Sequence, residues 1–336
     1  MPDHDPFISV VLPFRNADAT LAGAMESIHR QTWTRMEVIA VDDGSTDNSA
    51  RIAADFVRTD PRFRVITLEQ KGIVAALQVG CTAARGAYIA RMDGDDWAAP
   101  TRIARQAALM EADPRLGLTG TLVRVFGSAV GTGRRRYEAW LNELTDHDAI
   151  TRDRFIECPI AHPTFMMRRE AYDAVGGYED HEWAEDYDLL LRLWSAGWRL
   201  GKAPETLLHW RDTSGRLSMN DPRYSPARFR AAKRRFLLPW MLSQGRPFVQ
   251  WGAGRAGKPW LREWPPERRP AFAIDVHPRK IGKTIHGCPV KGWDALPAPG
   301  AAFIAVAVGA VGARETIRAW CVDNGYAEGR DFLFLA

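Results

Sequence analysis

The stretch that decides how this chain is interpreted is Ala90-Arg91-Met92-Asp93-Gly94-Asp95-Asp96-Trp97. It follows Gly86-Ala87-Tyr88-Ile89, which has the length and apolar character of a short buried strand. Crowded carboxylates repel one another and lose hydration when they are buried, so they need full exposure or a compensating cation. At the carboxyl end of a strand in an α/β sheet, where ligands usually bind, a divalent metal is a suitable cation. The competing interpretation is a solvated acidic turn.

The first hundred residues alternate between strand-like and helix-like segments. We expect strands at 7–12, 36–41, 64–68 and 87–92, and helices at 21–29, 50–57 and 72–84. Pro13 is expected to end the first strand. This alternation predicts an α/β fold, with a mostly parallel sheet and helices on both of its faces.

A second acidic group follows the strand expected at 36–41, in Asp42-Asp43-Gly44-Ser45-Thr46-Asp47. The carboxyl ends of parallel strands lie at one edge of a sheet, so these acids should share a cleft with those at 93–96. The alternative is that Asp42 or Asp43 only forms a turn and caps a helix, and Ser45 or Asp47 can also cap the next helix.

Six stretches in a fixed order carry a resemblance to a known family. They are residues 11–16, 41–47, 92–96, 161–170, 175–178 and 184–193. In this order and spacing they resemble the family 2 inverting glycosyltransferases of the GT-A fold, over roughly residues 7–215.

The resemblance implies roles for particular residues. The nucleotide-binding residues would be Pro13, Phe14, Arg15, Asn16, Asp42, Asp43 and Asp93. Asp95 and Asp93 would hold Mg²⁺ or Mn²⁺ on the diphosphate, with Asp96 close by. Apart from the resemblance, His209 follows a strand expected at 205–208 and is an extra candidate ligand for a metal or a phosphate. Asp186 would be the general base, and Glu185 is the alternative base. Arg211 or Arg216 could meet the diphosphate.

The implied reaction is the transfer of one sugar from a nucleotide-sugar, with a UDP-sugar first among the donors, to the hydroxyl of a glycan, lipid-linked or other acceptor. Only one base is needed, because a metal-neutralised diphosphate is a good leaving group. The absence of a Q-x-x-R-W motif after residue 186 argues against a processive synthase, and Gln78 stands where such sequences often carry Asn. Asp186 could instead only favour the helix dipole, and His162 could be a core histidine.

The second half of the chain has a different composition. We expect a glycosyltransferase domain at 1–220, a basic helical linker at 221–246 and a small Rossmann-like α/β domain at 247–336. The linker helix could rest on an anionic membrane surface, although such helices more often pack on their own domain.

A glycine fingerprint opens the third segment. Gly252, Gly254 and Gly257 have the G-x-G-x-x-G spacing, and Asp275 stands where an acid would bind ribose. The alternative functions are therefore an NAD(P)-binding oxidoreductase or a nucleotide-sensing protein. Prolines crowd the helix that should follow, so a regulatory or structural appendage is the preferred interpretation.

Composition and charge exclude several other classes of protein. The net charge of +4 over 336 residues does not imply a nucleic-acid partner, and the four cysteines are scattered, as expected of reduced thiols. The polar N-terminus is not a signal peptide, and the longest apolar run, at 301–311, is too short to span a bilayer. We expect a cytoplasmic protein, with peripheral membrane contact as a further option.

Overall fold

The computed structural model describes residues 5–128, 130–213 and 215–336 and divides the chain into two compact units. Unit 1 comprises Met1–Thr151 and Cys158–Phe229, and unit 2 comprises Arg152–Glu157 and Arg230–Ala336. The expected linker at 221–246 is thus shared between the units, because the continuous helix α10 (Pro226–Ser243) crosses the boundary.

Unit 1 is built on a sheet with the strand order β3-β2-β1-β4-β7-β6-β8-β5. Its strands are β1 (Ile8–Phe14), β2 (Met36–Asp42), β3 (Phe63–Thr67), β4 (Tyr88–Arg91), β5 (Trp97–Ala98), β6 (Leu116–Phe126), β7 (Met166–Arg168) and β8 (Arg199–Arg211). The pairs from β3 to β4 and the pair β6/β8 are parallel. The short strand β7 is antiparallel to both β4 and β6, and β5 is antiparallel to β8. The expected α/β fold with a mostly parallel sheet is confirmed.

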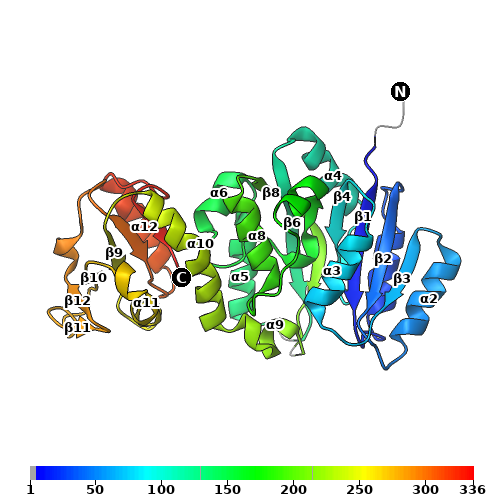
Figure 1. The fold of residues 1–336 in the computed structure, drawn as a ribbon, viewed down its shortest axis with the longest axis horizontal. Coiled ribbons are helices and arrows are strands. Elements are labelled where there is room, and N and C mark those ends of the chain that lie inside the picture. The colour runs from blue at the N-terminus through cyan, green and yellow to red at the C-terminus, as the bar shows by residue number, and fades with distance from the viewer. Residues whose placement is uncertain (1–4, 129, 214) are drawn as a thin grey trace. The chain divides into compact units, whose positions relative to one another are not determined.

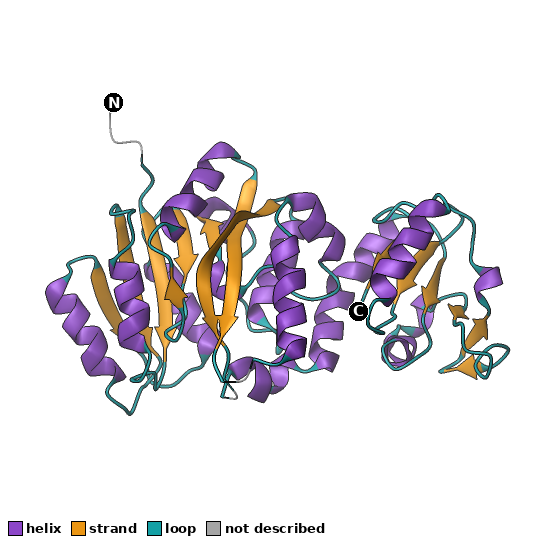
Figure 2. Ribbon diagram, turned by 180° about the vertical axis from the view of Figure 1, so that it is seen from behind, coloured by secondary structure: helices purple, strands orange, loops and turns teal. Residues whose placement is uncertain are grey.

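Helices flank this sheet on both faces (Figures 1 and 2). They are α1 (Leu21–His29), α2 (Ser49–Thr59), α3 (Ile73–Ala83), α4 (Arg102–Ala112), α5 (Thr132–Glu143), α6 (His147–Asp153), η1 (His162–Thr164), α7 (Arg169–Ala174), α8 (Glu185–Ser195), α9 (Leu217–Asn220) and η2 (Pro222–Tyr224). Alternate residues of β1, such as Val10 and Leu12, share a core with Met25 of α1. On the other face α3 comes very close, because a Cβ on its Gly80 would lie 2.4 Å from a methyl carbon of Val11.

One expected boundary is wrong, since β1 continues through Pro13 to Phe14. Pro13 is in register with Val41 of β2, whereas pairing of β1 with β4 ends at Val11 and Arg91. Backbone groups two residues apart point to the same side of a strand, and Val11 accepts from Met92 N on the β4 side. The missing N–H of Pro13 therefore faces the side where β4 has ended, and no ladder bond is lost.

Unit 2 has a second sheet with the order β11-β12-β10-β9-β13-β14. Its elements, besides most of α10, are β9 (Phe248–Trp251), α11 (Gly257–Glu263), η3 (Pro266–Arg268), β10 (Ala273–Ile274), β11 (Thr284–Ile285), β12 (Cys288–Lys291), η4 (Trp293–Ala295), β13 (Phe303–Val306), α12 (Ala313–Asp323) and β14 (Phe332–Phe334). All pairs except β11/β12 are parallel, as expected of a small Rossmann-like sheet. Within the described parts of the chain, no helix combines the length and the apolar character needed to cross a bilayer.

Candidate active site

The loops that follow β1 and β2 are joined by hydrogen bonds. Phe14 and Asp42 are register partners at the ends of their strands. Beyond them, Asn16 N donates to Ser45 Oγ at 3.0 Å, and Thr46 N donates to Asn16 Oδ1 at 2.8 Å. Asn16 has a φ of +46°, a conformation that asparagine tolerates better than most residues. The first two sequence motifs therefore form one connected surface at the carboxyl edge of the sheet.

Asp42 and Asp43 are both buried, but they hold different parts of this edge. Asp42 Oδ1 accepts from Ser45 N at 2.8 Å and closes its own turn. Asp43 uses both oxygens on the loop before α3, accepting from Lys71 N at 2.7 Å and from Gly72 N at 2.9 Å. Neither Ser45 nor Asp47 is the N-cap of α2, because that position is Asn48, which forms no side-chain capping hydrogen bond; Asp47 Oδ1 nevertheless accepts from Ser49 N at 2.9 Å. Contact of Asp42 and Asp43 with a nucleotide remains a prediction.

The turn after β4 brings three carboxylates together. Asp93, Asp95 and Asp96 each place one oxygen within 4.8 Å of the others. Asp93 forms an ion pair with the buried Arg91 at 2.5 Å. Asp96 is only 3% exposed, and while its Oδ1 accepts from Arg211 N at 2.7 Å, its buried Oδ2 has no hydrogen-bond partner among the described residues. A fully solvated acidic turn does not fit this burial.

The electrostatics of this turn favour a cation. Burial, and then the neighbouring Asp93 carboxylate, raise the pKa of Asp95 to about 6, although Arg91 opposes them. Burial also raises the pKa of Asp96 well above its usual value, with Asp93 and Asp95 adding to the effect. Arg91 therefore does not fully offset the burial and mutual repulsion of these carboxylates, and the cluster's donors are all carboxylate oxygens, which Mg²⁺ and Mn²⁺ prefer. The residues present fit a divalent metal ion.

Strand β8 supports the acidic turn from the side. Besides the bond from its backbone N–H to Asp96, Arg211 donates from Nε to Asp95 O at 2.8 Å. His209 lies opposite Trp97 in the β5/β8 register, and the two rings meet edge-on at 5.1 Å between centroids. His209 is not part of the described carboxylate group, so its role as a metal ligand remains a prediction. Arg216 is engaged by Asp212 at 2.5 Å, so neither candidate diphosphate arginine lacks a protein partner.

Helix α8 begins with the two acids that are candidates for the base. Glu185 is 2% exposed and accepts from Tyr224 Oη at 3.0 Å on Oε1 and 2.8 Å on Oε2. Burial, and then the adjacent Asp186, raise the pKa of Glu185 to about 7. Asp186 is only half-buried, and its Oδ1 accepts from Tyr187 N at 2.7 Å. The enclosed Glu185 is poorly placed to reach an acceptor, which favours Asp186 as the base.

His162 lies beside this pair and is buried. Its Nε2 is 2.7 Å from Tyr178 Oη, and its Nδ1 is 3.6 Å from Glu185 Oε1. Burial, together with the charge of Arg91, holds the pKa of His162 well below its usual range. His162 is therefore a neutral histidine with a side-chain partner, which the sequence left undecided. Neither Tyr178 nor Tyr224 was anticipated as a neighbour of Glu185.

In unit 2 the glycine fingerprint forms a tightly packed turn. Gly252 has a φ of +113°, and a Cβ on Gly257 would lie 1.9 Å from Gly252 O, so backbone conformation and packing account for these two glycines. A Cβ on Gly254 would meet only Lys280 Nζ, at 3.6 Å. The Asp275 carboxylate already accepts from Ala253 N at 3.0 Å, His277 N at 2.9 Å and Lys280 Nζ at 2.8 Å. An acid with three donors is poorly suited to binding ribose hydroxyls, and nothing here favours the oxidoreductase alternative.

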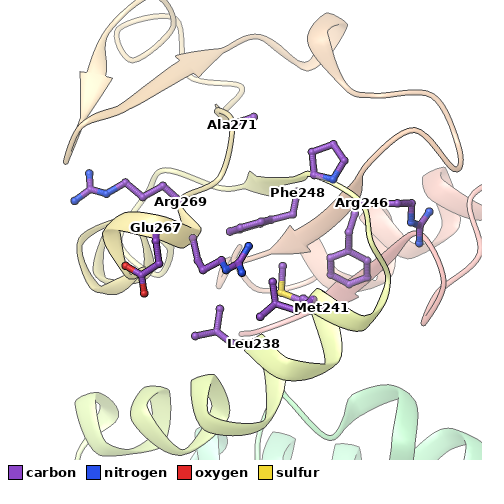
Figure 3. Close-up of a pocket in the computed structure, with 11 residues that line it drawn as sticks. Leu238, Met241, Arg246, Phe248, Glu267, Arg269 and Ala271 are labelled. Atoms are coloured by element: carbon purple, nitrogen blue, oxygen red, sulfur yellow. The ribbon is translucent and has the colours of Figure 1, made fainter.

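Unit 2 also has a pocket, which is not lined by the residues of the glycine turn. Met241 and Phe248 point into it, and Arg246, Glu267 and Arg269 lie around it (Figure 3). Phe248 begins β9, so the pocket is at the amino end of that strand, whereas ligands of α/β sheets usually bind at carboxyl ends.

A mostly parallel α/β sheet with carboxylates gathered at its carboxyl edge, and a further acid at the start of a helix, is the arrangement expected of a GT-A glycosyltransferase. The family model described as "Glycosyl transferase family 2" matches residues 9–176, and the chain belongs to this family. The chain is 32% identical over 225 residues to the putative glycosyltransferase EpsE of Bacillus subtilis, a match that covers 66% of this chain and 78% of EpsE. The protein is therefore a glycosyltransferase.

Solved structures support the fold. The mannosyltransferase PcManGT from Pyrobaculum calidifontis, in complex with GDP-Man and Mn²⁺, is 19% identical with a TM-score of 0.51. Residues 1–349 of S. aureus TarS, in complex with UDP-GlcNAc, are 18% identical with a TM-score of 0.53. Each match covers 70% of this chain, but only 63% of the PcManGT chain and 66% of the TarS chain.

Proposed function

We propose that this glycosyltransferase transfers a single sugar from a nucleotide-sugar to an acceptor hydroxyl, with inversion at the anomeric carbon and with dependence on a divalent metal ion. The observation that carries the proposal is the cluster of Asp93, Asp95 and Asp96, whose buried Asp96 Oδ2 has no partner among the described residues. A turn of this kind is costly without a cation. Asp95 is the first choice for metal ligation, with Asp93 as a second ligand.

Other residues of the protein bind the nucleotide and accept the proton of the acceptor hydroxyl. Asp42 and Asp43, with residues 13–16, form the nucleotide side of the cleft. Asp186 accepts the proton of the acceptor hydroxyl as the hydroxyl oxygen attacks the anomeric carbon, and a positioned base of this kind contributes about 10²–10⁴-fold to the rate. When bound, the divalent ion neutralises charge on the departing diphosphate. Attack from the face opposite the leaving group inverts the anomeric centre.

A UDP-sugar is the first donor to test, and a GDP-sugar is the second. Support comes from the printed ligands of the two structural neighbours, UDP-GlcNAc for TarS and GDP-Man for PcManGT. For the acceptor we propose a glycan or lipid-linked glycan. This is supported by a relative from Erwinia amylovora, 28% identical over 203 residues, that is named an amylovoran biosynthesis glycosyltransferase.

The test is a screen of nucleotide-sugars by thermal shift and by donor hydrolysis, each with Mn²⁺, Mg²⁺ or EDTA. A true donor should raise the melting temperature only with metal, because a bound ligand stabilises by mass action. Asp186→Asn should abolish transfer and leave donor affinity nearly unchanged. Turnover of a donor in EDTA would overturn metal dependence, and a comparable loss of donor affinity in Asp186→Asn would overturn the role of Asp186 as base.

A further inference from the structure

Residues 224–229, which follow strand β8, contact the start of helix α8. In unit 1, Tyr224 of η2 donates its hydroxyl to both oxygens of Glu185, at 3.0 and 2.8 Å. Arg228, in the first turn of α10, pairs with Glu182 at 2.9 Å. Phe229 stacks on Tyr187 with 5.5 Å between ring centroids. These three contacts therefore hold the chain on either side of Asp186.

The contact between Tyr224 and Glu185 differs from the other two because it involves a buried carboxylate, whereas the Glu182 carboxylate that pairs with Arg228 is exposed. Glu185 is 2% exposed, so water does not replace a missing donor easily. The Tyr224 hydroxyl bond lowers the pKa of Glu185, against the upward effects of burial and of Asp186. Tyr224 thereby favours the ionised form of a carboxylate that burial would otherwise neutralise.

Glu185 is surrounded by groups from several elements. His162 of η1 is 3.6 Å away, and Asp186 is the next residue of the chain. Arg91 of β4, Tyr178 of the loop after α7, and Arg223 of η2 also interact with it electrostatically. Within this set, Tyr224 supplies the hydrogen bonds that reach both carboxylate oxygens.

We propose that Tyr224 is a positioning residue for the transfer reaction, holding the Glu185 carboxyl group and, through it, the first turn of α8 so that Asp186 faces the acceptor. This rests on the proposed function of Asp186 as base. The residue itself touches neither donor nor acceptor in this scheme. Its effect should therefore fall on kcat, with the donor dissociation constant left unchanged.

The experiment compares Tyr224→Phe with wild type in the 336-residue chain. The phenyl ring is kept and only the hydroxyl is lost. Tyr326→Phe is the matched control, since Tyr326 also donates one hydroxyl bond, to Pro297 O at 2.7 Å, but in unit 2. Initial rates are measured between pH 5 and 9, and the dissociation constant of the donor's nucleoside diphosphate with Mn²⁺ is measured separately.

We expect kcat of Tyr224→Phe to fall about tenfold or more, the range expected for losing a hydrogen bond to a charged group. Nucleotide affinity should stay within about twofold, since one lost bond outside the donor site changes no donor contact. Because loss of the hydroxyl raises the pKa of Glu185 further, the acidic limb of the kcat profile should move to higher pH. In Tyr224→Phe/Glu185→Ala the loss should equal that of Glu185→Ala alone, because alanine removes both oxygens that accept from the Tyr224 hydroxyl.

Amide hydrogen exchange supplies a readout that does not depend on turnover. Tyr224→Phe should exchange faster in the first turn of α8 and at wild-type rates in the strands of the sheet. If wild type transfers no sugar, the proposed function fails, whereas faster exchange confined to that turn still supports the positioning role of Tyr224. A wild-type kcat, an unmoved acidic limb, or unchanged exchange in the α8 turn would each overturn the role of Tyr224.

Discussion

The two adjacent aspartates after β2 should respond very differently to the same mild substitution. Both carboxylate oxygens of Asp43 accept hydrogen bonds from backbone donors, Lys71 N and Gly72 N. An amide at position 43 must turn its NH₂ group toward one of these N–H groups, so Asp43→Asn loses one charge-assisted bond, weakens the other and brings two donors face to face. A hydrogen bond to a charged group contributes about 1.5–3 kcal/mol. We therefore expect Asp43→Asn to lower the free energy of unfolding by about 2–4 kcal/mol.

Asp42→Asn is the matched control. The hydrogen bond of Asp42 within the structure uses Oδ1 alone, on Ser45 N, and an amide oxygen can replace that acceptor. Asp42→Asn should lower the free energy of unfolding by less than about 1 kcal/mol, because the hydrogen bond from Ser45 N is weakened and not removed. If Asp42 is the residue that contacts the nucleotide, Asp42→Asn should lower donor affinity more than Asp43→Asn does.

The assay is urea unfolding of the full chain, followed by far-UV circular dichroism and by tryptophan fluorescence. Since the chain has two compact units, the transitions are fitted separately and only the unit 1 transition is compared. A destabilisation by Asp42→Asn equal to or greater than that by Asp43→Asn would refute the assigned division of labour.

Three further outcomes are expected. Asp96→Asn should raise the melting temperature without metal, because it removes a buried charge whose Oδ2 has no partner among the described residues, and should lose the stabilisation that Mn²⁺ gives wild type in a thermal-shift assay. Gly80→Ala should cost about 1–3 kcal/mol by overpacking against Val11, whereas Gly23→Ala, where a Cβ meets nothing within 4 Å, should be neutral or stabilising by up to about 1 kcal/mol in the same urea assay. Burial tends to raise the pKa of Asp331, but hydrogen bonds from Arg330, Ala327 N and Arg246 lower it to about 2. A folded-state pKa below the unfolded value gives stability that is present near neutral pH and lost as the pH falls from about 4 to about 2, so Asp331→Asn should lower the unit 2 melting temperature at pH 7 but not near pH 2.

Local elements of this protein follow from short-range patterns in its sequence. The helix expected at 21–29 is α1 with the same bounds. The strand expected at 36–41 is one residue shorter than β2, and the strand expected at 64–68 is displaced by one residue from β3. Apolar periodicity and turn residues act over a few positions, so they can be read without knowing the fold. The order of motifs along the chain was likewise sufficient to indicate the family. The continuation of β1 through Pro13 was not, because it depends on where the neighbouring strand ends.

The tertiary structure alone decided how the acids differ. Asp42 and Asp43 look equivalent in sequence, as do Glu185 and Asp186, but each pair divides once the partners are in place. Those partners are distant along the chain, as in the contacts of Asp96 with Arg211 over 115 positions and of Glu185 with Tyr224 over 39. Burial and pKa depend on such contacts, and no periodic pattern encodes them. The sequence by itself therefore determined the type of fold and the chemistry of the candidate groups, while folding decided which carboxylates are enclosed and which remain accessible.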